Sequence, residues 1–272
     1  MSMQPLGPVI VGVDGSDPAL AALDLAAEEA AARVTPLTVL HAHAPGVPAD
    51  AAAEDRHARR ILATAADRAR AEHPALAVTA TLIAAEPADA LVRSAMGSSL
   101  LVLGHRGRRS NVCLPASVTA RVLSEARVPV LIHRPFDAPV SAGTRPVVVG
   151  LADPANADGL LEFAFEAAAL RGAPLVTMHV WPPTHGNLPR DSEARVEGLA
   201  AAVGLWNDKY PEVSVRRLLR RDIDVVVAIT ALSRAAQLVV VGAPRWPGRT
   251  AGSVSNVLVQ RAGCPVAAVP LL

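Results

Sequence analysis

Two stretches of the sequence combine residue types that could bind a small polar ligand. In the first, Val11-Gly12-Val13-Asp14, a carboxylate follows directly after an apolar run. If that run is a buried strand, Asp14 stands at its carboxyl end, where it could accept a hydrogen bond from a base amino group or a ribose hydroxyl. The alternative is that Asp14, or Asp17 three residues later, caps the following helix, which is a common role for aspartate. The local sequence leaves both readings open.

The second stretch, residues 104–119, begins with Gly-His-Arg-Gly after another apolar run and ends with Ala-Ser-Val-Thr. Glycines let backbone amides approach phosphate oxygens closely, and a helix start with free N–H groups is a ready anion site. His105, Arg106, Arg108 and Arg109 could add positive charge. A turn from strand to helix can also need glycine for its geometry alone. The pattern therefore allows a phosphate site or a structural turn.

Both stretches lie in a sequence that repeats itself. Val9-Ile10-Val11-Gly12-Val13 recurs as Val147-Val148-Val149-Gly150-Leu151, and Leu101-Val102-Leu103-Gly104 recurs as Val239-Val240-Val241-Gly242, both shifted by 138 positions. Towards the end of each half the matches continue in the same order at a shift of 136. Matches in one order at a nearly constant shift indicate a tandem duplication. We predict one domain at 1–137 and a second at 145–272, joined by a linker that contains Pro, Gly and Ser.

Each half alternates short β-branched runs with longer Ala-rich amphipathic stretches, the pattern of parallel strands buried on both faces by crossover helices. We predict an α/β fold with one doubly wound, open, five-stranded parallel sheet in each domain, of the Rossmann-like kind that binds ligands at the carboxyl ends of its strands. Strands are expected near 8–13, 36–42, 76–83, 100–104 and 129–134, and near 146–151, 174–180, 213–219, 238–242 and 265–269. Helices are expected near 17–33, 52–72, 87–96 and 116–126, and near 156–171, 191–208, 223–235 and 253–262.

Composition and charge narrow the classes of function. The 272 residues carry 26 basic and 25 acidic side chains, a net charge of +1, without a block of like charge. This balance argues against nucleic acid or an anionic membrane as a partner. Cys113 and Cys264 have no metal-binding or redox spacing, so incidental thiols in a reducing compartment are expected. A basic leader and a run of about 18 apolar residues are both missing, so we expect a soluble, cytoplasmic protein.

The motifs, taken in order, resemble the universal stress protein family. They are Val-Asp-Gly-Ser after the first strand, Leu40-His41 in the second, the Leu-Gly-His-Arg-Gly turn and the Ala-Ser-Val-Thr helix start. The resemblance covers nearly the whole chain twice and is similar to the tandem, pseudo-two-fold form found in actinobacteria. It implies a non-catalytic stress or dormancy response protein, for which ATP, with Mg, is a ligand rather than a substrate.

The resemblance also implies which residues form the nucleotide site. The adenine and ribose would be framed by Gly12, Val13, Asp14 and Ala42, and the phosphates would be held by Gly104, His105, Gly107, Ser117, Val118 and Thr119.

This sequence departs from the family pattern in both repeats. Only eight residues separate Gly107 from Ala116, one fewer than in the family, and Ala116 stands in place of the third glycine. A methyl group where backbone must approach a phosphate is expected to weaken binding. The second repeat has Ala152 at the place of Asp14, unless Asp153 compensates, and Arg245 at the place of Gly107. We therefore expect at most one strong nucleotide site, in the first domain.

Other readings of the chain remain open. The altered loops also suit a nucleotide-free interaction scaffold of the same fold. An ATPase or nucleotidyl transferase would need a metal-binding carboxylate near the phosphate loop, and no convincing candidate stands there. His41 and His179, inside apolar strands, are interpreted as satisfied core or rim histidines. By resemblance the fifth strands, 129–133 and 265–269, are expected to pair, forming a pseudo-dimer within one chain or a homodimer.

Overall fold

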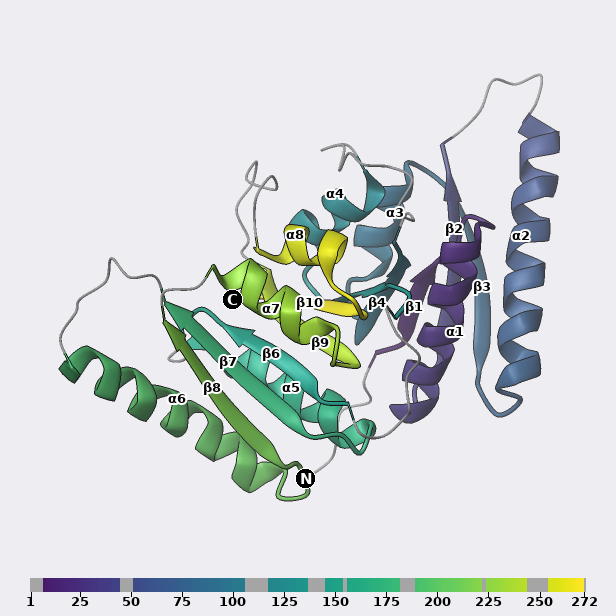
Figure 1. The fold of residues 1–272 in the computed structure, drawn as a ribbon. Coiled ribbons are helices and arrows are strands. Elements are labelled where there is room, and N and C mark those ends of the chain that lie inside the picture. Colours follow the sequence, from purple (N-terminus) through teal and green to yellow (C-terminus); the bar gives the residue numbers. More distant parts are fainter. Residues whose placement is uncertain are drawn as a thin grey trace. The chain divides into compact units, whose positions relative to one another are not determined.

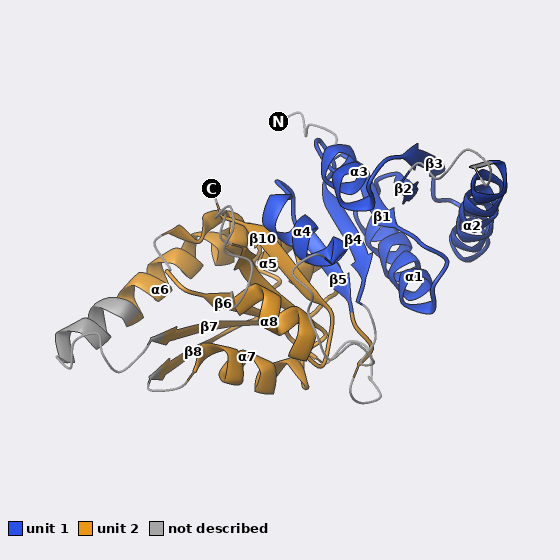
Figure 2. Cartoon of the chain, turned by 90° about the horizontal axis from the view of Figure 1, so that it is seen from above, with its two compact units in different colours: residues 1–133 blue, residues 134–272 orange. Residues whose placement is uncertain are grey.

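The chain forms two compact units of alternating strands and helices (Figure 1). The computed structural model describes residues 7–44, 51–105, 117–136, 145–153, 156–181, 189–221, 224–243 and 254–271. Contacts divide the chain into unit 1, Met1–His133, and unit 2, Arg134–Leu272 (Figure 2). The domain limits at 137 and 145 stay predictions, because 137–144 lie outside the described residues.

Unit 1 contains one parallel sheet with the strand order β3-β2-β1-β4-β5. Its β1 and β4 are neighbours although they are far apart in sequence, which is the doubly wound arrangement predicted above. The strands are β1 (Val9–Gly12), β2 (Leu37–His43), β3 (Val78–Ala84), β4 (Leu100–Gly104) and β5 (Val130–His133). The helices are α1 (Asp17–Ala32), α2 (Ala51–Glu72), α3 (Pro87–Ser94) and α4 (Val118–Glu125).

Helices cover both faces of this sheet, and this explains the uninterrupted apolar runs of its inner strands. α1 packs with α2, and α3 packs with α4; Figure 2 shows α1 and α3 on opposite sides of β1. The side chains of Val9, Ile10 and Val11 in β1 are therefore all buried. The side of α1 that faces the strands is almost entirely alanine, which lets the helix approach the sheet closely. Its buried apolar residues are Ala19, Ala22, Leu23, Ala26, Ala27 and Ala30.

Unit 2 repeats this topology with the strand order β8-β7-β6-β9-β10, again parallel throughout. Its strands are β6 (Val147–Leu151), β7 (Leu175–Trp181), β8 (Val215–Arg221), β9 (Leu238–Ala243) and β10 (Val266–Pro270). Its helices are α5 (Asp158–Leu170), α6 (Pro189–Lys209), α7 (Val225–Ser233) and α8 (Val254–Arg261). The predicted fold class, two tandem doubly wound parallel sheets, is confirmed.

The sequence pattern placed one strand two residues too early. We predicted a strand at 213–219, whereas β8 runs Val215–Arg221. Val213 is buried and apolar, but it lies in the turn before the strand. The strand continues instead through Arg220 and Arg221, polar residues that a pattern search for buried strands rejects.

The first helix of each unit ends in the same way, with one difference in sequence. After α1 the N–H of Thr35 donates to Ala30 O at 3.0 Å, and after α5 the N–H of Ala173 donates to Ala168 O at 3.0 Å. This bond is the mark of a Schellman motif, whose next-to-last residue takes the left-handed conformation. That residue is Gly172, with φ 56°, in unit 2 but Val34, with φ 54°, in unit 1. Valine is rarely found in this region.

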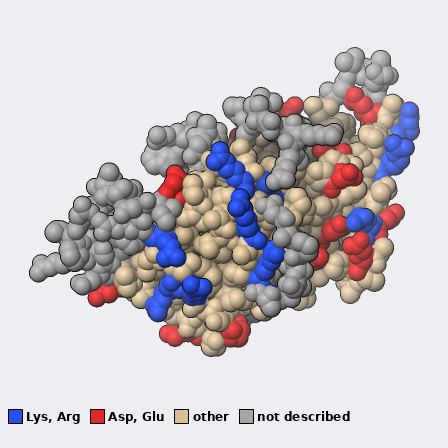
Figure 3. Space-filling model, in the orientation of Figure 1, with Lys and Arg blue, Asp and Glu red and all other residues tan. Residues whose placement is uncertain are grey.

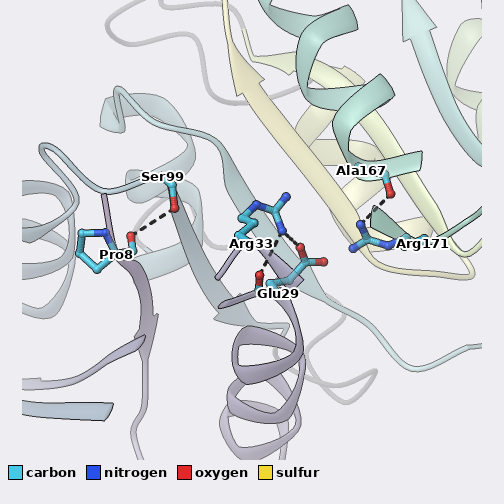
Figure 4. Close-up of polar contacts among 6 residues, drawn as sticks. All are labelled: Pro8, Glu29, Arg33, Ser99, Ala167 and Arg171. Carbon is cyan, nitrogen blue, oxygen red and sulfur yellow. Dashed lines mark hydrogen bonds and ion pairs between the residues drawn. The ribbon is translucent and has the colours of Figure 1, made fainter. Parts of the chain in front are cut away.

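An arginine at the end of each of these helices folds back over the last turn (Figure 4). In unit 1 the buried guanidinium of Arg33 forms an ion pair with Glu29. In unit 2 Arg171 Nη1 donates to the backbone carbonyl of Ala167 at 3.0 Å. Cations at a helix C-terminus interact favourably with the helix dipole, so both arginines stabilise the helix end.

Candidate functional site

The candidate site of unit 1 lies where β1 and β4 end side by side. Val11 pairs with Val102 in the parallel register, so the turn after Gly12 and the turn after Gly104 leave the sheet at the same edge. After β1 the chain continues into α1, and after β4 it leads to α4. α4 packs with α3, which lies on the opposite side of β1 from α1. Such a switch point is where doubly wound sheets bind their ligands.

Val13 is held in place at this edge by two hydrogen bonds to β2. Its N–H donates to Leu40 O at 2.9 Å, and its carbonyl oxygen lies 2.7 Å from Nδ1 of the buried His41. Because a carbonyl only accepts, Nδ1 of His41 carries the proton. The interpretation of His41 as a satisfied buried histidine is confirmed. The sequence reasoning missed its consequence, which is that this imidazole fixes the backbone just before Asp14.

Unit 2 has the same imidazole bond. His179 Nδ1 lies 2.8 Å from the carbonyl oxygen of Leu151, the residue that corresponds to Val13. This equivalence is the signal that would have identified the role, because a histidine repeated at the same strand position in both halves indicates a shared structural contact.

Asp14 is exposed, and one of its carboxylate oxygens shapes the turn between β1 and α1. Its Oδ1 accepts hydrogen bonds from the N–H of Ser16 at 3.0 Å and from Ser16 Oγ at 2.5 Å. Ser16 is the N-cap residue of α1, so neither Asp14 nor Asp17 caps that helix. The other oxygen, Oδ2, has no hydrogen bond to any residue that the structure describes. Asp14 thus presents one carboxylate oxygen that the turn does not use.

Gly104 has a packing role that is independent of any ligand. A Cβ atom at this position would lie 2.5 Å from the carbonyl oxygen of Pro18 and 2.7 Å from its carbonyl carbon. The end of β4 therefore touches the backbone of the first turn of α1, and only glycine fits without moving one of them. The next residue, His105, donates its N–H to His133 O at 3.2 Å, which continues the pairing with β5.

The start of α4 completes the described part of the site. Ser117 is its N-cap, and its Oγ accepts a hydrogen bond from the N–H of Ala120 at 3.2 Å. Val118 and Thr119 occupy the first turn, in which backbone N–H groups have no partner within the helix. Ion pairing of Arg121 with Asp89, at 2.6 Å, links α4 to α3 and holds this helix start in position.

The remaining predicted residues divide into two groups. Ala42 lies near the carboxyl end of β2 and is half-buried. Gly107 lies outside the described residues, as do Ala116 and the arginines at 106, 108 and 109. The structure thus brings the ends of β1, β2 and β4 to one sheet edge, and it does not describe the loop from 106 to 116.

The corresponding edge of unit 2 lacks the carboxylate. Ala152 follows β6 at the place of Asp14. The next residue, Asp153, is exposed and accepts a hydrogen bond from Asn156 Nδ2 at 2.7 Å. Its carboxylate therefore has a partner in its own turn. Arg245 and the segment 251–253 lie outside the described residues.

The described residues also bear on the Mg²⁺ ion that the sequence resemblance led us to expect. No group of three or more His, Cys, Asp or Glu side chains that could hold a metal ion occurs within the described ranges. Mg²⁺ bound with a nucleotide usually takes one or two carboxylates besides phosphate oxygens and waters. The described residues therefore fit an ion that is held mainly by phosphate oxygens and waters, not a metal site built from protein ligands alone.

No described helix is long and apolar enough to cross a membrane.

Comparisons with known proteins agree with this architecture. Residues 6–134 and 143–270 each match the model of the universal stress protein family. A universal stress protein of Mycobacterium tuberculosis (strain H37Rv) is 31% identical in an alignment of 285 positions that covers 95% of each chain. One of Mycolicibacterium smegmatis is 29% identical in an alignment of 284 positions that covers 96% of each chain. The crystal structure of a universal stress protein from Archaeoglobus fulgidus, 18% identical, covers 97% of this chain and 96% of its own, with a TM-score of 0.74.

Proposed function

Since the chain belongs to the universal stress protein family, we propose that it is a non-catalytic stress-response protein whose unit 1 binds ATP, with Mg, where β1 and β4 end. The observation that carries the proposal is the carboxylate of Asp14. One of its oxygens fixes the turn, and the other has no partner among the described residues. A preformed acceptor on a backbone held by His41 suits a ligand that offers N–H or O–H groups.

The ligand's polar groups can be matched to the site in order. The Asp14 Oδ2 would accept from the base amino group or a ribose hydroxyl, with Gly12, Val13 and Ala42 beside it. The phosphates would lie towards the other side of the switch point, near the N–H groups of Val118 and Thr119. A helix N-terminus favours negative charge there. Ser117, Gly104, His105 and Gly107 complete this proposed set.

Mg²⁺ would be held by the phosphate oxygens and waters, because both oxygens of Asp14 are already assigned, Oδ1 to the turn and Oδ2 to the base or ribose. Bound to ATP, the ion neutralises phosphate charge. The proposal contains no turnover: a single carboxylate that also organises a turn serves to orient a ligand, and nucleotide binding then acts by changing the population of a conformation or an assembly.

A calorimetric titration of Mg·ATP into the nucleotide-free full chain tests the site. We expect saturable binding of about one ATP per chain. In Asp14→Asn the amide oxygen can still accept from Ser16, whereas the amide nitrogen replaces an acceptor by a donor. Loss of a hydrogen bond to a charged group corresponds to about 10- to 100-fold weaker binding. The matched control is Asp153→Asn in unit 2, which is expected to leave ATP binding unchanged.

Two outcomes would contradict this proposal. Equal affinity of the Asp14→Asn variant and the unchanged chain would remove Asp14 from the site. Steady phosphate release that follows the protein through purification and disappears in Asp14→Asn would contradict the non-catalytic part.

The second candidate is an interaction scaffold of the same fold that binds no nucleotide. The observation that favours it is the contact between Gly104 and Pro18, because the glycine is required by packing whether or not a phosphate binds. The N-cap role of Ser117 likewise needs no ligand. The same titration separates the two candidates: no heat up to millimolar ATP supports the scaffold, and adenine nucleotide that co-purifies with the chain contradicts it.

Pairing of the fifth strands and a cytoplasmic location remain part of the proposal. Light scattering coupled to gel filtration, over a range of protein concentrations, distinguishes one chain from a homodimer. Fractionation of cells that produce the protein tests the location.

A further inference from the structure

An edge strand of unit 2 carries an unusual concentration of positive charge. β8 reads Val-Arg-Arg-Leu-Leu-Arg-Arg and, among the described strands of its unit, pairs only with β7. Arg216, Arg217 and Arg220 are exposed. None of the three forms an ion pair with a residue in the part of the chain that the structure describes. Figure 3 shows basic side chains on the β8 side of the visible face of unit 2.

These arginines stand on both sides of the strand. Successive side chains of a strand point to opposite faces of the sheet, so Arg216 and Arg220 share one face and Arg217 lies on the other. Between them runs the outer edge of β8, where backbone N–H and C=O groups have no neighbouring strand among the described residues of unit 2. Positive charge therefore flanks a free set of backbone hydrogen-bonding groups above and below the sheet.

The fold itself does not require these charges. In unit 1 the equivalent edge strand is β3, whose Val78 pairs with Leu37 as Val215 pairs with Leu175. At the positions of Arg216, Arg217 and Arg220 this strand has Thr79, Ala80 and Ile83. Charged residues on an edge often discourage unwanted strand pairing, but the equally long β3 is protected by no charge of its own. The arginines are thus a property of unit 2 that calls for a separate reason.

We propose that β8 binds an extended acidic segment of a partner protein, which adds to the sheet as a strand while its carboxylates pair with Arg216, Arg217 and Arg220. Main-chain hydrogen bonds to the edge supply affinity in this mode of recognition, and the alternating side chains supply specificity. Directly opposed side chains on paired strands are close enough for arginine to contact a carboxylate with two parallel hydrogen bonds.

An acidic peptide fits these features better than a nucleic acid. A peptide strand satisfies both the N–H and the C=O groups at the edge of β8, whereas phosphate oxygens can only accept from the N–H groups. Its side chains also alternate between the two faces, as the arginines do. The balanced charge of the whole chain, +1, offers no general attraction to polyanions.

Fluorescence anisotropy with a labelled peptide tests the proposal on the full chain. The probe Glu-Glu-Val-Val-Glu-Glu-Val places glutamates opposite every arginine of β8 when it pairs antiparallel. Glu-Val-Glu-Val-Glu-Val-Glu has the same composition but puts all its charge on one face. We expect saturable, salt-sensitive binding of the first probe and at least about threefold weaker binding of the second, since about half of the matched pairs are lost.

Variants then locate the binding surface. Arg216→Thr with Arg217→Ala introduces the residues that unit 1 has at these positions, and Arg220→Gln removes the third charge. This triple variant is expected to bind the first probe at least about tenfold more weakly. The matched control removes three exposed arginines of α2, by substituting glutamine at Arg56, Arg59 and Arg60, and is expected to bind as the unchanged chain does.

A second variant keeps the test decisive if the first folds poorly. Lysine at the same three positions preserves the charge but not the bidentate hydrogen bonding of arginine to a carboxylate. It is expected to weaken peptide binding by a smaller factor than the triple variant does. The proposal is overturned if the unchanged chain shows no saturable binding, if the α2 control loses as much affinity as the β8 variant, or if the two peptides bind equally. It is also overturned if a seven-nucleotide thymidine oligonucleotide binds as tightly as the first peptide.

Discussion

Replacing Val34 with glycine is expected to stabilise unit 1, because Val34 is held in a backbone conformation that its side chain opposes. Its φ of 54° lies in the left-handed region, where a Cβ atom costs about 1–2 kcal/mol. The side chain is 91% exposed, so its removal forfeits almost no buried apolar surface. Gly172 ends α5 with the same hydrogen bonds and a φ of 56°, which shows that glycine fits this turn.

The expected gain is smaller than the strain that is relieved. Glycine makes the unfolded chain more flexible, which offsets about 0.5–1 kcal/mol of the relieved strain. The free energy of unfolding of unit 1 is therefore expected to rise by about 0.5–1 kcal/mol. For a unit of this size that corresponds to a rise in Tm of about 2–4 °C.

Differential scanning calorimetry and urea unfolding of the full chain, with the two units fitted as separate transitions, measure this change. The reverse substitution, Gly172→Val, is the matched control and is expected to lower the stability of unit 2 by a similar amount. The reasoning is refuted if Val34→Gly leaves the unit 1 transition unchanged or lowers it, or if Gly172→Val has no effect.

Three further predictions test other contacts. Thr177 is fully buried, and its Oγ1 has no hydrogen-bond partner among the described residues, whereas Val39 occupies the equivalent place in unit 1. Thr177→Val is therefore expected to raise the unfolding free energy of unit 2 by about 1–2 kcal/mol, as measured by urea titration. Gly104→Ala places a methyl group against the α1 backbone and is expected to lower the Tm of unit 1, whereas Gly159→Ala, in open space, is expected to leave the Tm of unit 2 unchanged or slightly higher; equal effects would contradict the packing role of Gly104. Burial lowers the pKa of His133 in the folded chain from its ordinary value of 6.5, so the unfolded chain binds the proton more readily. The stability of the fold is therefore expected to fall as the pH drops below about 6.5. His133→Gln is expected to reduce this loss, as measured by thermal melts across that pH range.

The strands of this fold follow closely from the sequence because most of them are buried on both faces. β4 occupies 100–104, as predicted, since its whole length is apolar and bounded by Ser and Gly. β8 is the strand whose position the apolar pattern did not predict correctly. A strand at a sheet edge needs no continuous apolar run, so the apolar pattern alone could not fix the register of its seven residues.

The candidate site was less predictable, because its geometry depends on contacts between residues that are distant in sequence. Whether Asp14 caps α1 depends on which residue occupies the N-cap position, and the structure places Ser16 there, with Asp14 accepting hydrogen bonds from its N–H and Oγ. The reason for Gly104 lies in Pro18, on a helix at the other end of the domain's sequence, and no local pattern contains that information. The recurrence of His41 as His179 signals a shared structural contact, but its partner, the carbonyl oxygen of Val13, is seen only in the structure, where β2 lies beside β1.

The tight approach of β4 to α1 also affects how such proteins diverge. If Asp14 contacts a nucleotide as proposed, a lineage that stops using the site no longer needs a carboxylate after the first strand, and unit 2 already has alanine at that position. The same lineage still needs glycine at position 104 as long as the first turn of α1 packs against that residue. On the same proposal, the residue aligned with Asp14 is the informative one for sorting relatives of this chain into those that retain and those that have lost the ligand, whereas the glycine records only descent from a common fold.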